Sequence, residues 1–175
     1  MSAPAAHGDR SVAFFTAIVA VLAALGTLFA NHTSIQTLSV RNDVLLHSQQ
    51  ATDRFAYYQN KQLKVTLYQA LLTSQLARGN GAAAIRHAMA EEQRSSFGVY
   101  AQGKALEARA ETEKEHADGL FHAYETLEIA TTLFEISIAF ASIAALTQVR
   151  ITLWAACVLT AIGAVTAVIG YLQAH

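Results

Sequence analysis

The sequence is poor in residues that break helices or cross-link a chain. It contains one proline, one cysteine and one tryptophan among 175 residues. Cys157 lies inside an apolar run, so the sequence excludes a disulfide framework and a thiolate metal site. Pro4 lies in a tail of small residues at the N-terminus, and residues 31–126 have no proline that would interrupt a helix.

Charged residues are absent from two long stretches. Residues 12–30 and 151–175 contain no Asp, Glu, Lys or Arg, whereas residues 31–126 hold ten basic and ten acidic residues. The net charge of −1 gives no basic stripe, so a nucleic-acid partner is not expected. Apolar ends around a balanced polar middle are typical of a membrane protein with an extramembrane insertion. We therefore expect the lipid bilayer to be one partner of this chain.

The first apolar stretch, residues 12–30, is predicted to be a transmembrane helix that follows an N-terminal tail, residues 1–11. At 1.5 Å per residue it spans about 28 Å, close to the hydrocarbon core of a bilayer. The alternative is a cleaved signal peptide. The run is longer than the apolar core of a signal peptide, and Leu28 stands where a small residue is wanted before cleavage after Ala30. An uncleaved anchor is therefore favoured.

Two further transmembrane helices are predicted at residues 127–147 and 151–173, joined by a tight loop at 148–150. Trp154 and Tyr171 lie near the two ends of the last span, as residues of an aromatic belt do. The sequence thus predicts an all-α protein. Three transmembrane helices carry a long antiparallel, coiled-coil-like helical hairpin, which is inserted between the first and second spans.

The orientation follows from the short flanks of the spans. Arg10 and Arg150 lie on the same side of a three-span protein, and the positive-inside rule makes that side cytoplasmic. Residues 31–126 then face the periplasm or the exterior, in a protein of the bacterial inner membrane. Four basic residues after the first span favour the reverse orientation: Arg41, Arg54, Lys61 and Lys64.

Residues 31–126 are predicted to form two helical arms around a turn near 78–81, where the sequence is RGNG. Heptad-like steps place six apolar residues of the first arm on one face: Ala51, Phe55, Tyr58, Val65, Leu72 and Leu76. Gln62 and Gln69 interrupt that face. A break at Gly98 or Gly103 would fold the second arm into a shorter bundle. An isolated helical hairpin buries little surface, so we expect a homo-oligomer or a complex with another membrane protein.

Small residues recur at helical spacing in the first and third spans. Steps of three and four align Ala13, Ala17, Ala20, Ala24 and Thr27, and likewise Ala156, Thr160, Gly163, Ala167 and Gly170. In lipid, helices pack where small side chains let the backbones approach. The two stripes are expected either to pack the three spans together or to join subunits, unless they only reflect the abundance of alanine.

The segment ATDRFAYYQNKQLKVTLYQ, and the final stretch from EHADGLFHAYETLE onward, resemble a bacterial family of membrane proteins. This is the domain-of-unknown-function family four-three-three-seven. Its members share a motif close to Ala-x-Asp-x-Trp-x-Tyr-Tyr-Gln-x-Lys. Phe55 stands at the tryptophan position, and four residues match: Tyr57, Tyr58, Gln59 and Lys61. The resemblance implies three spans and a bacterial origin, but no activity. The motif cluster is either a site for a ligand or peptide or the packed seam of the hairpin.

Two acidic residues lie in the second predicted span. Glu128 is near its boundary, but Glu135 lies about 12 Å inside it by helix rise. An ionisable group at that depth is a candidate functional residue, because burying its charge is costly. The alternatives are a neutral carboxyl group that hydrogen-bonds across a helix interface, or a span whose boundary lies later in the chain.

A polar stripe leads along the same helix toward Glu135. It comprises Glu111, Asp118, His122, Glu125, Glu128, Thr132 and Glu135. Within it, Asp118, His122 and Glu125 could bind one metal cation or relay a proton. The alternative is the solvated face of a helix near the membrane surface, and the sequence gives no motif for a cofactor.

No catalytic set can be assembled from the sequence, and RGNG lacks the Lys and Ser or Thr of a phosphate-binding loop. We expect a non-enzymatic scaffold or accessory subunit that presents its helical hairpin for protein–protein assembly. The alternatives are an ion- or proton-linked membrane protein that uses Glu135, and a carboxylate–histidine metal-binding module at the membrane surface.

Overall fold

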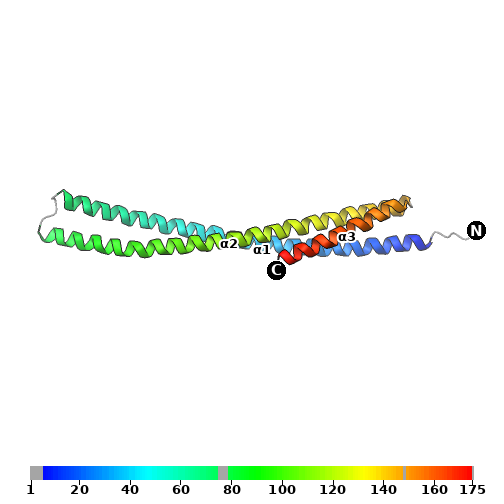
Figure 1. The fold of residues 1–175 in the computed structure, drawn as a ribbon, viewed down its shortest axis with the longest axis horizontal. Coiled ribbons are helices and arrows are strands. Elements are labelled where there is room, and N and C mark those ends of the chain that lie inside the picture. Colours follow the sequence, from blue (N-terminus) through cyan, green and yellow to red (C-terminus); the bar gives the residue numbers. More distant parts are fainter. Residues whose placement is uncertain (1–5, 75–78, 148, 175) are drawn as a thin grey trace, which may run out of the picture. The chain divides into compact units, whose positions relative to one another are not determined.

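The computed structural model describes residues 6–74, 79–147 and 149–174, and these form three helices without a strand (Figure 1). Helix α1 spans Ala6–Thr73, α2 spans Asn80–Thr147 and α3 spans Arg150–Gln173. The predicted all-α fold is confirmed. Four residues that the sequence-based predictions involve lie outside the described residues: Pro4, Leu76, Arg78 and Gln148.

Helices α1 and α2 run unbroken through positions where the sequence suggested a boundary or a break in the helix. α1 begins at Ala6, inside the predicted tail, and runs without a break through the predicted first span and the first arm. α2 runs through Gly98 and Gly103. A break at either glycine would have produced the shorter bundle, so that alternative is wrong. A glycine inside a helix destabilises it by about 1 kcal/mol relative to alanine. This cost is too small to interrupt a helix that packs against another.

The turn between α1 and α2 contains a backbone conformation that favours glycine. Gly79 has a φ of 61°, in the left-handed region where a Cβ atom would be strained. α2 begins at the next residue. This position explains why the sequence has glycine there.

The chain divides into two compact units. Met1–Ser39 and His116–His175 form one, which we call the three-helix unit. Val40–Glu115 form the other, the two-helix unit, in which α1 and α2 pack against each other. Each of the three helices contains a stretch that is long and apolar enough to cross a membrane.

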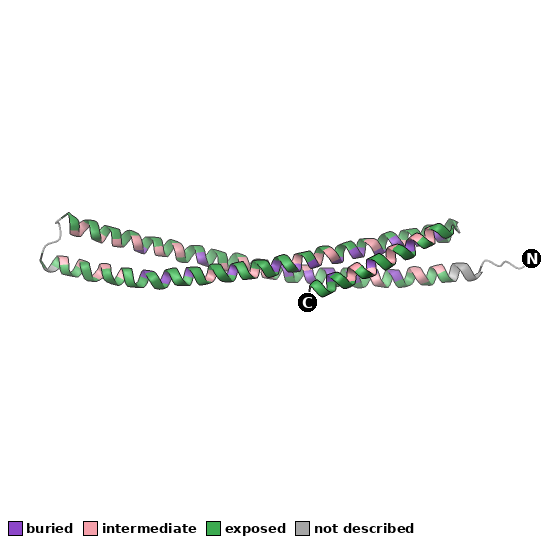
Figure 2. Cartoon of the chain, in the orientation of Figure 1, coloured by how far each residue is buried: buried purple, intermediate pink, exposed green. Residues whose placement is uncertain are grey.

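The core of the three-helix unit is small and apolar. Val19, Ala23 and Phe134 form its buried cluster, and Val19 is completely inaccessible. Buried positions recur along the facing sides of the helices (Figure 2). A buried polar contact also joins α2 to α3, because Ser137 Oγ donates to the Ala156 carbonyl oxygen at 2.7 Å and lies 2.6 Å from Thr160 Oγ1.

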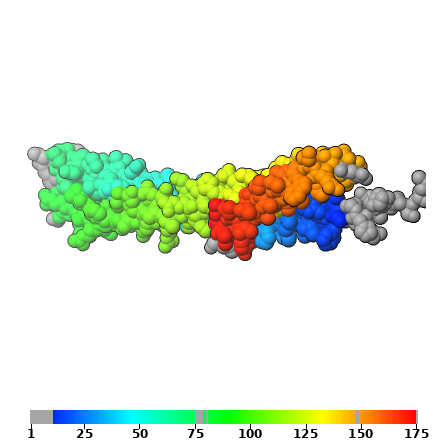
Figure 3. All heavy atoms as spheres, turned by 45° about the vertical axis from the view of Figure 1, so that its right-hand side comes forward, coloured from blue at the N-terminus to red at the C-terminus, as the bar shows by residue number. Residues whose placement is uncertain are grey.

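Helix α3, orange to red in Figure 3, lies against α2. Two glycines of the third predicted span lie at this contact. A Cβ atom on Gly163 would lie 3.0 Å from the Phe134 ring, and one on Gly170 would lie 2.9 Å from Leu127 Cγ. Ala156 is also buried, and Ala167 packs against the core cluster. These contacts need residues with little or no side chain.

The alanine stripe of the first predicted span has a different position. Ala13, Ala17, Ala20, Ala24 and Thr27 are all exposed on the three-helix unit. The inward face of α1 is instead formed by Val19, Ala23, Gly26 and Ala30. This stripe therefore does not pack the three helices together, because the contact face of α1 is rotated away from it.

The inner face of the two-helix unit contains most of the predicted apolar positions. Ala51 is buried, and Phe55, Tyr58, Val65 and Leu72 are partly buried. Two polar positions differ from expectation. Gln69 is exposed, whereas Lys61 is only 9% exposed. The inner face is thus rotated toward Lys61 and away from Gln69.

Candidate functional site

The most connected polar cluster of the two-helix unit surrounds Lys61. Its ammonium group donates to Glu92 Oε2 at 2.6 Å and to Ser95 Oγ at 2.9 Å. Lys64 reaches the other oxygen of the same carboxylate at 3.4 Å. An ammonium group that leaves water needs such partners, so the cluster fixes which residues of α1 and α2 face each other.

The electrostatics of this pair follow from its hydrogen bond. The Lys61 ammonium holds the pKa of Glu92 below its ordinary value, although partial burial acts in the opposite direction. The same hydrogen bond to Glu92 raises the pKa of Lys61. Both groups are therefore charged over the whole neutral range, and the cluster is suited to packing rather than to proton transfer.

The aromatic residues of the family motif belong to the same region. The Tyr57 ring lies 5.1 Å from Lys61 Nζ, a cation–π distance. Tyr58 and Phe55 both contact Tyr100, with ring centroids 5.2 Å and 5.9 Å apart respectively. Gln59 is exposed, so it does not take part in this packing.

Phe55 also lies against a glycine of α2. A Cβ atom on Gly103 would lie 2.9 Å from Phe55 Cε1, so the ring occupies the space above that glycine. The motif residues Phe55, Tyr58 and Lys61 thus form part of a helix–helix seam. Of the two roles that the sequence left open for the cluster, the observed contacts favour packing.

Sequence analysis missed three partners in this unit. Nothing in the spacing singled out Glu92 or Ser95 as partners of Lys61, or the contact of His47 Nδ1 with Glu113 Oε2 at 2.7 Å. Each contact joins residues at least 31 positions apart in the chain. Finding them requires the register of α1 against α2, which one sequence does not define.

The two-helix unit also carries large apolar side chains on its outer surface. The exposed fractions are 69% for Leu45, 68% for Leu63, 58% for Leu67 and 70% for Phe97. Leu63 and Leu67 are four residues apart and therefore lie on the same side of α1. They stand among charged residues such as Lys64, so this surface is amphipathic.

The predicted intramembrane acids lie on the outward side of α2 in the three-helix unit. Glu128 and Glu135 are both exposed. A hydrogen bond to the Glu128 carboxylate raises the pKa of the nearby Tyr124 hydroxyl. Glu135 has no hydrogen-bond or ion-pair partner among the residues that the structure describes. A neutral Glu135 that bonds across an interface within one chain is therefore not observed.

The residues predicted to bind a metal or relay protons lie on the same helix but do not gather around one point. His122 Nδ1 lies 3.3 Å from Glu125 Oε2, and both side chains are exposed. Asp118 is exposed one turn earlier. Within residues 6–74, 79–147 and 149–174, no three His, Cys, Asp or Glu side chains are placed to hold one ion. The metal and relay roles stay predictions.

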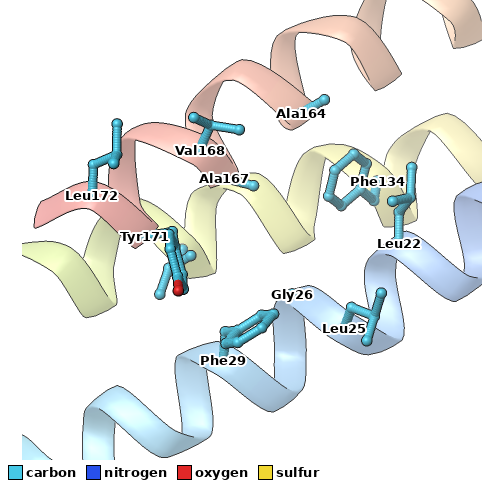
Figure 4. Close-up of a pocket in the computed structure, with 11 residues that line it drawn as sticks. Leu22, Leu25, Gly26, Phe29, Phe134, Ala164, Ala167, Val168, Tyr171 and Leu172 are labelled. Carbon is cyan, nitrogen blue, oxygen red and sulfur yellow. The ribbon is translucent and has the colours of Figure 1, made fainter. Parts of the chain in front are cut away.

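A groove with a volume of 330 Å³ opens on the three-helix unit (Figure 4). Phe29 and Tyr171 face each other across it, with ring centroids 5.6 Å apart, and Phe134 also lines it. Almost all of its lining is apolar. Such a groove can hold hydrocarbon.

No curated protein and no solved structure matches this chain. A family model with the description "Domain of unknown function (DUF4337)" matches residues 8–173, almost the whole sequence. The chain belongs to the DUF4337 family, as its aromatic-Gln-Lys motif and its final apolar segments predicted.

Proposed function

We propose that this protein is a non-enzymatic scaffold of the bacterial inner membrane, which presents its two-helix unit to a protein partner. The observation that carries the proposal is the exposure of large apolar side chains on that unit, among them Leu63 and Leu67 on one side of α1. Large apolar side chains grouped on a charged helical surface are typical of protein–protein interfaces.

The membrane part of the proposal rests on the three apolar helical stretches. Each is long enough to cross a bilayer, and Arg10 and Arg150 flank them on one side. The N-terminus then lies in the cytoplasm and the two-helix unit in the periplasm or exterior. A reporter enzyme inserted at Asn80 tests this topology, and activity of a cytoplasm-specific reporter there would reverse it.

The scaffold role is tested by changing the exposed leucines. Leu63→Glu with Leu67→Glu should reduce co-purification of the partner from native membranes by at least about tenfold, because each change places a charge in an apolar contact. Thr66→Glu with Gln69→Glu is the matched control. It adds the same two charges to exposed polar positions of the same helix. Circular dichroism checks that both variants keep their helical content.

The outcome is read by quantitative mass spectrometry of cross-linked and purified complexes. The scaffold proposal predicts one or a few proteins, or additional copies of this chain, that disappear with the leucine variant and remain with the control. Identical recovery in both variants contradicts it. Recovery lost equally in both would assign the effect to charge and not to the apolar surface.

A second candidate function is favoured by one observation. Glu135 is exposed on an apolar helix and has no partner among the described residues. A carboxyl group in that position could carry a proton across part of a membrane. Proton or cation flux into vesicles that contain the protein, abolished by Glu135→Gln, would support this role. Absence of flux above that of empty vesicles would remove it.

A further inference from the structure

The outward side of α2 carries a row of polar and small residues across the second predicted span. Steps of four and three residues place them on one face, and all are exposed: Glu128, Thr132, Glu135, Ala139 and Ser142. Alternating steps of this kind define the contact seam of a two-stranded coiled coil. In this unit the buried side of α2, with Phe134 and Ser137, is already covered by α1 and α3.

This seam is unfavourable against lipid, because a carboxylate at the middle of a membrane helix loses its hydration without gaining a partner. Thr132 satisfies its own hydroxyl by donating to the Glu128 carbonyl oxygen at 2.9 Å, but Glu135 has no such bond among the described residues. A partner that offers a hydrogen bond at the depth of Glu135 would remove this cost.

The chain itself supplies a group with the required chemistry. Its three predicted spans contain no Lys, Arg or His, so another copy cannot offer an ion pair at that depth. It can offer its own Glu135. Copies inserted in the same orientation hold this residue at the same depth. Two carboxyl groups are complementary when one keeps its proton, because the protonated group donates a hydrogen bond and the other accepts it.

The shape of the surface admits a second helix. Ala139 and Ser142 project little beyond the α2 backbone, and the exposed Ala13, Ala17 and Ala20 of α1 lie near Ser142. The α1 alanines and Ser142 line an open groove of 630 Å³. Close approach of this kind is what helix association in lipid requires. The α3 stripe is not available for it, because its glycines already contact α2.

From these observations we propose that two copies of this chain pack side by side through the outward seam of α2, with the two Glu135 carboxyl groups hydrogen-bonded to each other. The two α2 helices run parallel, since both copies have the same orientation in the membrane. The α1 alanine stripe faces the neighbouring copy. The inference rests on the proposed membrane insertion.

Cysteine cross-linking tests the seam directly, because the native chain has only Cys157. In full-length protein that carries Cys157→Ser, Ala139→Cys should form a disulfide-linked dimer when native membranes are oxidised. Val158→Cys is the control. It is 54% exposed on α3, and the Ser137 contacts to Ala156 and Thr160 place it near the same depth. We expect at least about a tenfold higher dimer yield at position 139.

Substitution of Glu135 tests the hydrogen bond across the seam. In the Ala139→Cys background, Glu135→Gln should keep the cross-link, because an amide can both donate and accept. Glu135→Leu should reduce the yield several-fold. Equal cross-linking at positions 139 and 158 would overturn the proposed seam, and so would a cross-linked product whose mass is not twice that of the chain. An unchanged yield with Glu135→Leu would overturn the carboxyl pair.

The same membranes separate this inference from the proposed function. Protein that is released by an alkaline carbonate wash is not membrane-inserted, and then both proposals fail. Protein that stays in the washed membranes without a cross-link at position 139 leaves the scaffold proposal intact and overturns the α2 seam alone.

Discussion

The two units of this protein bring their helices together by different means. In the three-helix unit, Gly163 and Gly170 let α3 lie close to α2, and Ser137 supplies a buried hydrogen bond. In the two-helix unit, α1 and α2 are joined by polar side-chain contacts, of which the Lys61–Glu92 ion pair is the least exposed. Aromatic residues around Tyr100 fill the space between those helices.

This difference in packing matches the surroundings that we propose, which are lipid for the three-helix unit and water for the two-helix unit. Lipid gives no hydrophobic driving force between apolar helices, so close contact of small residues must hold them together. Water hydrates charged surfaces, and the hydrophobic effect favours the burial of aromatic rings. α1 and α2 take part in both units, and along each of them the sequence changes from one mode of packing to the other.

The largest effect is expected from a substitution that disrupts the close contact between α3 and α2 in the three-helix unit. Gly163→Leu should destabilise the protein by about 3 kcal/mol, because even the Cβ atom would lie 3.0 Å from the Phe134 ring. The measurement is the unfolding midpoint in detergent micelles. Gly119→Leu is the control, since a Cβ atom at Gly119 meets no atom within 4 Å. Equal midpoints for the two variants would contradict the close packing of α3.

The corresponding change in the two-helix unit should be smaller. Gly103→Ala places a Cβ atom 2.9 Å from Phe55 Cε1 and should cost about 1–2 kcal/mol. Adding Phe55→Leu frees the space and should recover part of that loss. A double-mutant cycle measures this coupling between the two positions. Additive effects of the two changes would show that Phe55 does not lie over Gly103.

The charged contact of the two-helix unit can be tested through its pH dependence. The pKa of Glu92 is lowered in the folded protein, so its contribution is present above about pH 4.5 and is lost as the pH falls further. Glu92→Gln should therefore have a lower unfolding midpoint than the native protein at pH 7, and this difference should vanish in acid. Glu91→Gln, at the exposed neighbouring position, is the control. A difference that does not shrink as the pH falls below about 4.5 contradicts an ionic contribution.

Sequence analysis predicted the elements better than the contacts between them. Heptad spacing identified Phe55 and Tyr58 as inward-facing, because apolar periodicity depends only on the helix itself. The same spacing gave no sign that Lys61 is buried, since its partner Glu92 comes from the other arm. The alanines of the first span were prominent in composition. The contact face was instead set by Val19 and Gly26, which only the positions of α2 and α3 reveal.

The smallest expected effect is a gain in stability, and it separates glycines that are needed for packing from those that are not. Gly98 lies inside α2, and a Cβ atom there would meet no atom within 4 Å. Gly98→Ala should therefore stabilise the two-helix unit by about 0.5–1 kcal/mol, because alanine loses less backbone entropy in a helix. Thermal unfolding of Gly98→Ala and Gly103→Ala should shift the midpoint in opposite directions. A loss of stability in both would mean that α2 is also contacted at Gly98, by a partner that covers this side of the two-helix unit.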